Sequence, residues 1–318
     1  MMDYTKKIIK DIKDIKIQGA SNIVYSCFDA FEKEVLAFKT GSHVKYFDQI
    51  VKEFWSSRPT EPAMKHFLTS FMIQIDVKGK YSVLKPVLLE FIKNSRIEQE
   101  EAIGKISDRF VRDLRQKTII FTHCHSSIVE ECIKKAHKYG LLKFVVNTET
   151  RPLYQGRTTA LSLAKAGIEV KHIVDSAVFA FAKNLSHEHP AKDMLFVTGA
   201  DVITNKGDLI NKIGTKQISV LMDRMGIRHY VVTTNSKIDV IDKNWTLEKV
   251  EIRDPKEIWD VSNKNIEVIN YVFDVTPFSL INRLYTENGV GKPQSMVLKH
   301  KVTEDYVEIW KKLDKIKP

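Results

Sequence analysis

The sequence predicts an α/β protein in which an N-terminal helical domain is followed by a Rossmann-like domain with a mostly parallel sheet. Up to about residue 115, apolar residues recur at helical spacing. From residue 117 onward, short β-branched and aromatic runs alternate with helical stretches. Such alternation is typical of parallel strands with helices on both faces of the sheet. We therefore expect the helical domain over residues 1–115 and the Rossmann-like domain over residues 116–318.

The helices of the first domain follow from apolar residues placed three or four positions apart. The stripes are Ile8, Ile9, Ile12 and Ile15; Val24, Cys27, Phe28 and Phe31; and Val83, Val87, Leu88, Phe91 and Ile92. Breaks are expected at Gly19, 40–42 and 56–59. Pro62 suits a helix start, because a proline in the first turn loses no internal hydrogen bond. The last helix of this domain is expected over residues 81–115.

The second domain is predicted from strand-like runs, each followed by a turn and a helix. The strands are expected over 118–122, 144–146, 170–174, 194–198 and 229–233. The helices are expected over 128–139, 158–166, 177–184 and 215–225. Gly140, Gly167 and Gly226 stand where helices should stop, since glycine tolerates the left-handed conformation of a helix C-terminus.

Composition excludes several classes of protein. In 318 residues the apolar fraction is 43% and the charged fraction 28%, so a disordered or fibrous chain is excluded. The net charge of +10 suits anionic ligands. The three cysteines, odd in number and irregularly spaced, form no disulfide framework, so we expect a cytoplasmic protein. With no apolar run of about 18 residues, no membrane span is expected.

Nucleotide and nucleic-acid motifs are missing from the sequence. No Gly-x-Gly-x-x-Gly follows the first strand, and no phosphate loop of the Walker type is present. The lysines are spread along helices as pairs such as Lys6-Lys7 and Lys134-Lys135, which is typical of a solvated face. Nucleic-acid binding is therefore not expected.

Polar residues gather where the predicted parallel strands end. Ligands of an open parallel sheet bind beyond the carboxyl ends of its strands. The segments at these ends are Thr122–Ser127, Asn147–Pro152, Asp175-Ser176, Gly199–Asp201 and Thr233–Lys237, with Asn211–Thr215 ahead of a helix. One thiol, several carboxyls, lysines and arginines should thus meet at one edge. We interpret this edge as a phosphate-handling active site.

Cys124, Asp201 and Arg58 each allow a functional and a structural interpretation. Cys124 ends a strand just before a predicted helix, whose dipole would lower the thiol pKa; it could equally be a small buried apolar residue. Asp201 is either a general acid or base, held neutral by partial burial, or a helix cap. Arg58 is either a phosphate clamp or a surface residue. His123 and His125 lack further ligands at metal-site spacing, so no metal is expected.

Six segments of the chain resemble, in order and spacing, one superfamily. It contains the α, β and δ subunits of translation initiation factor 2B, the methylthioribose-1-phosphate isomerases and the archaeal ribose-1,5-bisphosphate isomerases. The segments are Thr122–Ser126, Glu149–Pro152, Gly199–Asp201, Asn211–Thr215, Ser57–Thr60 and Phe273–Pro277. The resemblance covers nearly the whole chain and is densest from Lys117 to Gly289.

The resemblance implies an isomerase closest to the ribose-1,5-bisphosphate enzyme. The isomerases carry a catalytic cysteine and aspartate where this chain has Cys124 and Asp201, whereas initiation factor subunits commonly hold other residues. It implies that Cys124 accepts a proton and that Asp201 donates one. The residues implied to hold substrate phosphates or hydroxyls are Gly19, Ala20, Ser21, Arg58, Ser126, Asn211, Lys212 and Lys237.

One position departs from the pattern of these isomerases. They have an arginine before the Gly19-Ala20 pair, where this chain has Gln18, and glutamine cannot copy a bidentate phosphate contact. Gln18 therefore leaves open a non-catalytic, initiation-factor-like regulatory subunit that binds a nucleotide or sugar phosphate.

The resemblance also implies partners. It implies a small phosphorylated sugar as substrate, a nucleotide as a candidate activator, no cofactor, and a homo-oligomer, either a dimer or a hexamer built of dimers. The apolar residues Val272, Phe273, Phe278, Leu280 and Ile281 could contribute to that contact or could belong to the core.

Overall fold

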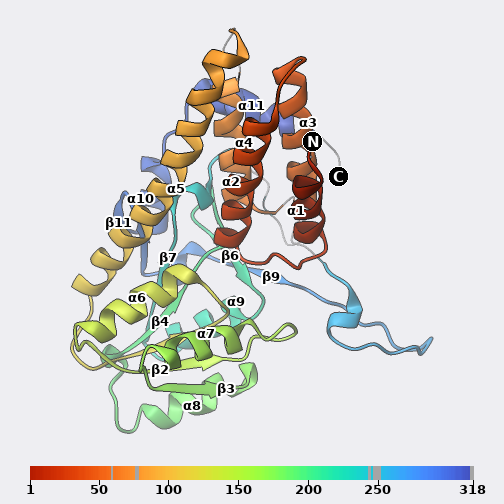
Figure 1. Ribbon diagram of the computed structural model, residues 1–318. Coiled ribbons are helices and arrows are strands. Elements are labelled where there is room, and N and C mark those ends of the chain that lie inside the picture. The colour runs from red at the N-terminus through yellow and green to blue at the C-terminus, as the bar shows by residue number, and fades with distance from the viewer. Residues whose placement is uncertain (59, 76–78, 243–244, 246–251, 316–318) are drawn as a thin grey trace. The chain divides into compact units, whose positions relative to one another are not determined.

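The computed structural model describes residues 1–58, 60–75, 79–242, 245 and 252–315 (Figure 1). It divides into two compact units. The helical unit comprises Met1–Glu101 with Lys301–Pro318, and the sheet unit comprises Ala102–His300. This division differs from the expected one at residue 115, because helix α11 (Glu304–Asp314) packs on α4 (Pro62–Ile75) and so joins the helical unit.

The helical unit contains α1 (Asp3–Lys13), α2 (Ala20–Ala37), α3 (His43–Ser57), α4, the first part of α5 (Tyr81–Arg112) and α11. The three apolar stripes of the sequence correspond to α1, α2 and α5. Pro62 begins α4 as expected. Of the expected break at 56–59, Pro59 lies outside the described residues. Cys27, Phe28 and Phe31 are buried on one face of α2, as their spacing predicts.

Helix α11 is held to the rest of the helical unit by aromatic and charged contacts. Trp310 meets Trp55 edge to face with ring centroids 5.2 Å apart. The Lys65 ammonium lies 3.0 Å from the Asp314 carboxylate and faces both indole rings. A buried ammonium needs such partners, because moving it out of water is costly. These contacts explain why the C-terminal helix belongs to the helical unit.

The sheet unit is built on a seven-stranded sheet in the order β11-β10-β7-β4-β1-β2-β3. All neighbouring strands are parallel except the β10–β11 pair, so the predicted mostly parallel sheet is confirmed. The strands are β1 (Thr118–Thr122), β2 (Leu142–Thr148), β3 (Val170–Ile173), β4 (Met194–Thr198), β7 (Arg228–Val232), β10 (Arg283–Thr286) and β11 (Gly289–Gly291).

Helices cover both faces of this sheet (Figure 1). One face packs on the end of α5, on α6 (Ser127–Lys138) and on α7 (Gln155–Lys165). The other face packs on α8 (Val178–Leu185) and α9 (Thr215–Arg224). Neighbouring strand residues such as Ile119 and Ile120 enter opposite clusters, because side chains alternate along a strand.

A second, four-stranded sheet was not predicted. Its order is β8-β5-β6-β9, with β5 (Val202–Thr204), β6 (Leu209–Lys212), β8 (Ile238–Asp239) and β9 (Phe273–Thr276). Strands of two to four residues are too short to show an alternating pattern in the sequence. This sheet matters for the site because Lys212 ends β6.

The short helix α10 (Pro293–Lys299) follows β11. Throughout the described part of the chain, every helix is too short or too polar to cross a lipid bilayer.

Gly156 is required by close packing at the end of β2. A Cβ atom placed on Gly156 would lie 1.8 Å from the Thr148 carbonyl oxygen, whereas Gly104 in α5 has no atom within 4 Å of such a position. We expect Gly156→Ala to lower the free energy of unfolding by about 3 kcal/mol, because backbone must move to admit the methyl group.

Gly104→Ala is the matched control and should raise stability by up to about 1 kcal/mol, since alanine favours the helix. Urea unfolding followed by circular dichroism measures both variants. A Gly156→Ala protein as stable as the parent would contradict the close approach of α7 to β2.

Candidate functional site

The strands β1 and β4 are neighbours in the parallel sheet, and the chain leaves them toward opposite edges of that sheet. From β1 the chain continues to β2 and β3 on one side, and from β4 it continues to β7 on the other. Such a switch point opens a crevice at the carboxyl ends of the strands. Cys124 follows β1 and Asp201 follows β4, so both border this crevice.

The loops after β1 and β4 are in direct contact. A Cβ atom on Gly199 would lie 2.7 Å from the Ser126 hydroxyl oxygen, so only glycine fits beside Ser126. Ser126 also caps α6, its hydroxyl accepting a hydrogen bond from the Val129 N–H at 3.4 Å. The switch-point site, by which we mean Cys124, Ser126, Asp201, Lys212 and Lys237, is assembled around this contact.

Cys124 is held in a left-handed backbone conformation by its neighbours. Its φ is 70°, which costs a non-glycine residue about 1–2 kcal/mol. Its N–H donates to the Thr150 hydroxyl at 2.9 Å, and its carbonyl accepts from the Thr159 hydroxyl at 3.2 Å. These bonds offset the strain and orient the half-buried thiol.

The thiol pKa is raised, contrary to the expectation from the helix N-terminus. Burial raises the pKa of Cys124 to about 11, the Lys212 ammonium lowers it, and the Asp201 carboxylate raises it. The prediction of a lowered pKa was wrong because α6 begins only at Ser127, with Ser126 as its cap, so desolvation outweighs the dipole. The same interactions place Lys212 and Asp201 within electrostatic range of the sulfur.

Two lysines are buried beside the thiol and the carboxyl. The Lys237 ammonium donates to the Ala200 carbonyl at 2.6 Å, next to Asp201. The Lys212 ammonium lies 4.8 Å from the centre of the Phe273 ring. Both lysines are less than a tenth exposed. The two buried ammonium groups bring positive charge to the site, which favours an anionic ligand.

Asn211 supports the backbone segment that carries Lys212. It lies on β6 next to Lys212, and its amide donates to the Thr215 hydroxyl at 3.0 Å. Thr215 donates in turn to the Lys212 carbonyl at 2.7 Å. The start of α9 is thereby tied to the end of β6.

Both nitrogens of His123 are engaged within the protein. The ring lies 2.6 Å from the Thr148 hydroxyl through Nδ1 and 2.8 Å from the Ile213 carbonyl through Nε2. The carbonyl can only accept, so this network assigns the proton to Nε2. Burial lowers the pKa of His123, which keeps the ring neutral. Among the described residues, no group of three or more His, Cys, Asp and Glu could hold a metal ion.

Two acidic residues that we had not proposed for the site shape it. Asp175 accepts the backbone N–H groups of Thr150 and Arg151 at 2.8 and 2.7 Å and raises the pKa of Cys124. Asp274 accepts the N–H of Gly214 at 2.9 Å, and burial raises its pKa to about 6. The position of Asp175 after a strand was the available signal, but its role depends on the fold.

Four residues proposed for substrate binding lie in the helical unit. Gly19, with φ of 82°, precedes α2, Ala20 and Ser21 begin it, and Arg58 ends α3. The Gln18 amide donates to the Ile15 carbonyl at 2.8 Å. The binding role of these four residues remains a prediction from the resemblance.

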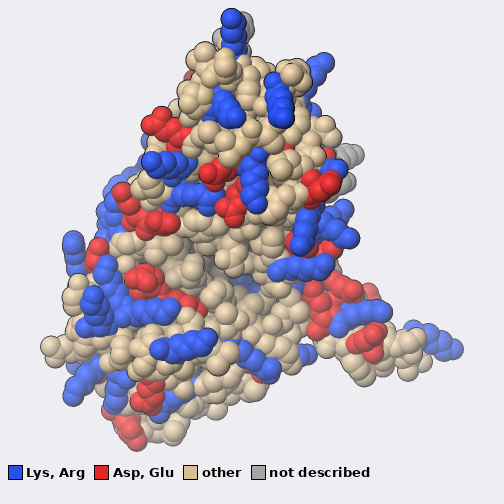
Figure 2. Space-filling model, viewed as in Figure 1, with Lys and Arg blue, Asp and Glu red and all other residues tan. Residues whose placement is uncertain are grey.

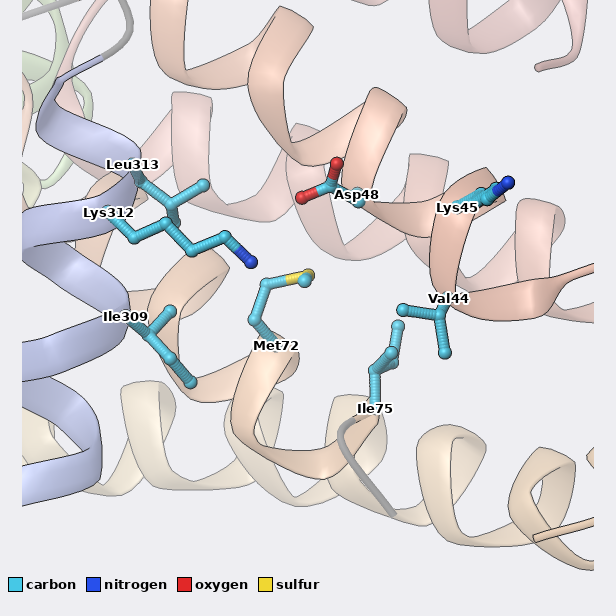
Figure 3. Close-up of a pocket in the computed structure, with 8 residues that line it drawn as sticks. All are labelled: Val44, Lys45, Asp48, Met72, Ile75, Ile309, Lys312 and Leu313. Carbon is cyan, nitrogen blue, oxygen red and sulfur yellow. The ribbon is translucent and has the colours of Figure 1, made fainter. Parts of the chain in front are cut away.

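A cavity of about 210 Å³ lies within the helical unit, between α3, α4 and α11 (Figure 3). Its lining is mainly apolar, with Val44, Met72, Ile75, Ile309 and Leu313. The Asp48 carboxylate at its rim is paired with Lys52 at 2.7 Å. Because the lining of this cavity is mainly apolar, we assign the chemistry to the switch-point site.

On the face shown in Figure 2, lysines and arginines are interspersed with acidic residues.

Comparison with known proteins assigns the family. A profile of the initiation factor 2 subunit family matches residues 16–293. The chain belongs to this family. Ribose 1,5-bisphosphate isomerase of Pyrococcus furiosus is 31% identical over 92% of this chain and 91% of its own length. Methylthioribose-1-phosphate isomerase of Dehalococcoides mccartyi is 32% identical over 89% of this chain and 88% of its own.

Solved structures share the fold of this family member. The translation initiation factor eIF-2B of Pyrococcus horikoshii matches with a TM-score of 0.76 at 24% identity, over 93% of this chain and 100% of its own. The 5-methylthioribose 1-phosphate isomerase of the same organism matches with a TM-score of 0.73 at 23% identity, over 98% of this chain and 88% of its own. The fold alone therefore does not separate enzyme from factor.

Alkylation of Cys124 by iodoacetamide tests the electrostatics of the site. We expect its rate to rise with pH toward a midpoint near the thiol pKa of about 11. Lys212→Met should raise the midpoint by removing a stabilising positive charge, and Asp201→Asn should lower it by removing a repelling negative charge. Mass spectrometry of the labelled peptide reports the rate separately from those of the buried Cys27 and Cys132.

Lys138→Met, which removes an exposed lysine of α6, is the control and should leave the midpoint unchanged. A midpoint below about 8.5, the usual thiol pKa, would restore the interpretation in which the helix dipole dominates.

Proposed function

We propose that this protein is a sugar-phosphate isomerase and that its reaction converts ribose 1,5-bisphosphate to ribulose 1,5-bisphosphate. The observation that carries the proposal is the juxtaposition of Cys124 and Asp201 at the ends of β1 and β4, with Lys212 in electrostatic range of the thiol. A proton-transferring pair beside buried ammonium groups is the arrangement that an anionic sugar needs.

The relatives support the reaction class, and two buried lysines of the site favour one substrate within it. Curated relatives that cover about nine-tenths of this chain are named either ribose 1,5-bisphosphate isomerase or methylthioribose-1-phosphate isomerase. Both names describe isomerases of a pentose whose first carbon bears phosphate. The bisphosphate fits better here because Lys212 and Lys237 provide two buried cations for a doubly phosphorylated ligand.

The chemistry explains why an acid and a base are needed together. Phosphate on the anomeric oxygen prevents ordinary ring opening to a free aldehyde. An acid therefore protonates the ring oxygen as its bond to C1 breaks, while a base removes the proton on C2. The C2–H electron pair forms the C1=C2 bond of an enol phosphate. Protonation of C1 and loss of the C2 hydroxyl proton then give the ketose.

Within this scheme Cys124 is the base at C2 and Asp201 is the acid at the ring oxygen. The two residues approach the sugar from neighbouring strand ends, which suits groups that act on different atoms of one ring. With a pKa of about 11, only about one thiol in ten thousand is ionised at pH 7 in the free protein. Lys212, which favours the thiolate, is therefore the residue that makes the base available.

The remaining residues of the proposal bind and position the substrate. Ser126 and Lys237 border the crevice from the loops after β1 and ahead of β8, and Asn211 steadies Lys212. The resemblance adds Gly19, Ala20, Ser21 and Arg58, which belong to the helical unit, as proposed phosphate-binding residues. Exclusion of water would prevent hydrolysis at C1 as its bond to the ring oxygen breaks.

A regulatory, non-catalytic subunit is the second candidate function. Gln18 favours it, because the guanidinium expected at this position in the isomerases is replaced by an amide. A binding subunit would retain affinity for a sugar phosphate or nucleotide without turnover. An assay of sugar-phosphate turnover therefore distinguishes the two functions.

Substitution of the two central residues tests the proposed reaction. With ribose 1,5-bisphosphate as substrate, Cys124→Ser and Asp201→Asn should each lower kcat by about 100-fold or more, because each removes a positioned acid or base. Formation of ribulose 1,5-bisphosphate is followed by mass spectrometry. Asp223→Asn, which changes an exposed carboxylate of α9, is the matched control and should retain the parent rate.

Failure of the parent protein to turn over this sugar or 5-methylthioribose 1-phosphate, while binding either one, would favour the regulatory subunit. Full activity in both variants would overturn the assigned roles.

The pH dependence of kcat/KM tests which residue is the base. If Cys124 acts as thiolate, the residual kcat/KM of Asp201→Asn, which lacks the titrating acid, should rise about tenfold per pH unit between pH 7 and 9, because deprotonation of a thiol whose pKa is raised limits the active form. Lys212→Met should shift this rise to higher pH. A profile that falls over the same range would instead make the protonated thiol the acid.

A further inference from the structure

Three polar side chains connect helix α6 to the backbone of Cys124. Helices α6 and α7 lie side by side on one face of the parallel sheet (Figure 1). Glu130 of α6 and Thr159 of α7 are buried, with 6% and 1% exposure. The His125 ring contacts both, because its Nδ1 atom lies 3.0 Å from a Glu130 carboxylate oxygen and 3.2 Å from the Thr159 hydroxyl oxygen. The proposed reaction assigns no step to these three side chains.

The partners of the His125 ring determine where its proton lies. The Thr159 hydroxyl donates to the Cys124 carbonyl at 3.2 Å, so the hydroxyl oxygen can only accept from the ring. Burial raises the pKa of Glu130, but its hydrogen-bond partners lower it by more, so the group is an ionised carboxylate that also only accepts. Nδ1 of His125 is therefore assigned the proton.

The Glu130 carboxylate is itself held in place between the two helices. Its second oxygen accepts a hydrogen bond from the Ser162 hydroxyl at 2.5 Å and lies 3.4 Å from the Lys134 ammonium. Lys134 also donates to the Ser162 hydroxyl oxygen at 2.9 Å. Because these bonds fix one oxygen of the carboxylate, the other oxygen marks a fixed place for the His125 ring.

The connection ends on the peptide unit between Cys124 and His125. The carbonyl of this unit accepts from Thr159. Burial raises the pKa of the Cys124 thiol to about 11, whereas the N–H of the same peptide unit hydrogen-bonds the sulfur and lowers it. A trans peptide is planar, with its carbonyl and N–H pointing in opposite directions, so a fixed carbonyl also fixes the direction of the N–H. The left-handed φ of 70° at Cys124 needs such support.

We infer that Glu130, His125 and Thr159 are positioning residues, which hold this peptide unit with its N–H directed at the sulfur. An N–H in that direction stabilises the thiolate more than the thiol, because a hydrogen bond to a charged group is the stronger one. The positioning residues therefore make the base of the reaction easier to form. The consequence for turnover rests on the proposed function, whereas the consequence for the reactivity of the thiol does not.

The sign of one substitution separates positioning from a direct effect of charge. A carboxylate acting through space raises the pKa of a thiol, so Glu130→Gln would then make Cys124 react faster. If Glu130 acts through His125, the same substitution loosens the peptide unit and Cys124 reacts more slowly. The charged groups close to the sulfur, which are Lys212, Asp201 and Asp175, are the same in this variant and in the parent.

Alkylation of Cys124 by iodoacetamide at pH 8, measured on the labelled peptide, tests the inference. Thr159→Val keeps the side-chain shape and should lower the rate about tenfold, because the thiolate loses one hydrogen bond. Glu130→Gln should lower it about threefold or more, by the same loss in part. Thr159→Ser keeps the hydroxyl and should recover most of the parent rate. Glu131→Gln, which changes an exposed carboxylate of α6, is the matched control and should alkylate at the parent rate.

The double variant Glu130→Gln with Thr159→Val distinguishes positioning from a general loosening of the fold. Because both residues act through one peptide unit, the double variant should react no more slowly than Thr159→Val alone. Independent structural damage would instead multiply the two losses. Circular dichroism and urea unfolding establish that each variant is folded under the conditions of the assay.

The inference is overturned if Thr159→Val is alkylated at the parent rate, or if Glu130→Gln is alkylated faster than the parent. With ribose 1,5-bisphosphate as substrate, kcat of both variants should fall by about the same factors as the alkylation rates. A parent protein that turns over no sugar phosphate, but whose variants show the expected alkylation rates, would overturn the proposed function and leave the positioning role supported.

Discussion

The contact between Gly199 and Ser126 is the constraint on which the site depends. It brings the loops after β1 and β4 together at the one place in the sheet where the chain turns to opposite sides. A crevice opens between the two loops at this point, and the residues that follow each strand border it. Cys124 and Asp201, 77 positions apart in the chain, become neighbours for this reason.

Electrostatic interactions determine whether the Cys124 thiol can act as a base beside Asp201. Burial opposes ionisation of the Cys124 thiol, and the nearby carboxylates of Asp201 and Asp175 oppose it further, so that Lys212 is the main group that favours the thiolate. Lys237, tied to the Ala200 carbonyl, adds a second buried cation. The positive charge of these two buried ammonium groups suits an anionic ligand.

Much of the secondary structure could be predicted, because it depends on local patterns of apolar and turn residues. The ends of β1 and β4 match the predicted strands, since these strands are continuous apolar runs bounded by turns. The second sheet was missed because its strands are two to four residues long. The place of α11 in the helical unit was not predicted, because its attachment through Trp310 and Lys65 leaves no signal in the spacing of residues. Membership of Cys124 and Asp201 in a proposed site followed from position and resemblance.

By itself, the sequence determined the succession of helices and strands and the residue types available at their ends. Those properties depend on neighbours within a few positions, and apolar periodicity and turn residues record them directly. The tertiary structure decided the ionisation of Cys124 and the burial of Lys212 and Lys237. These properties depend on desolvation and on charges brought close by folding, which no local pattern in the chain can encode.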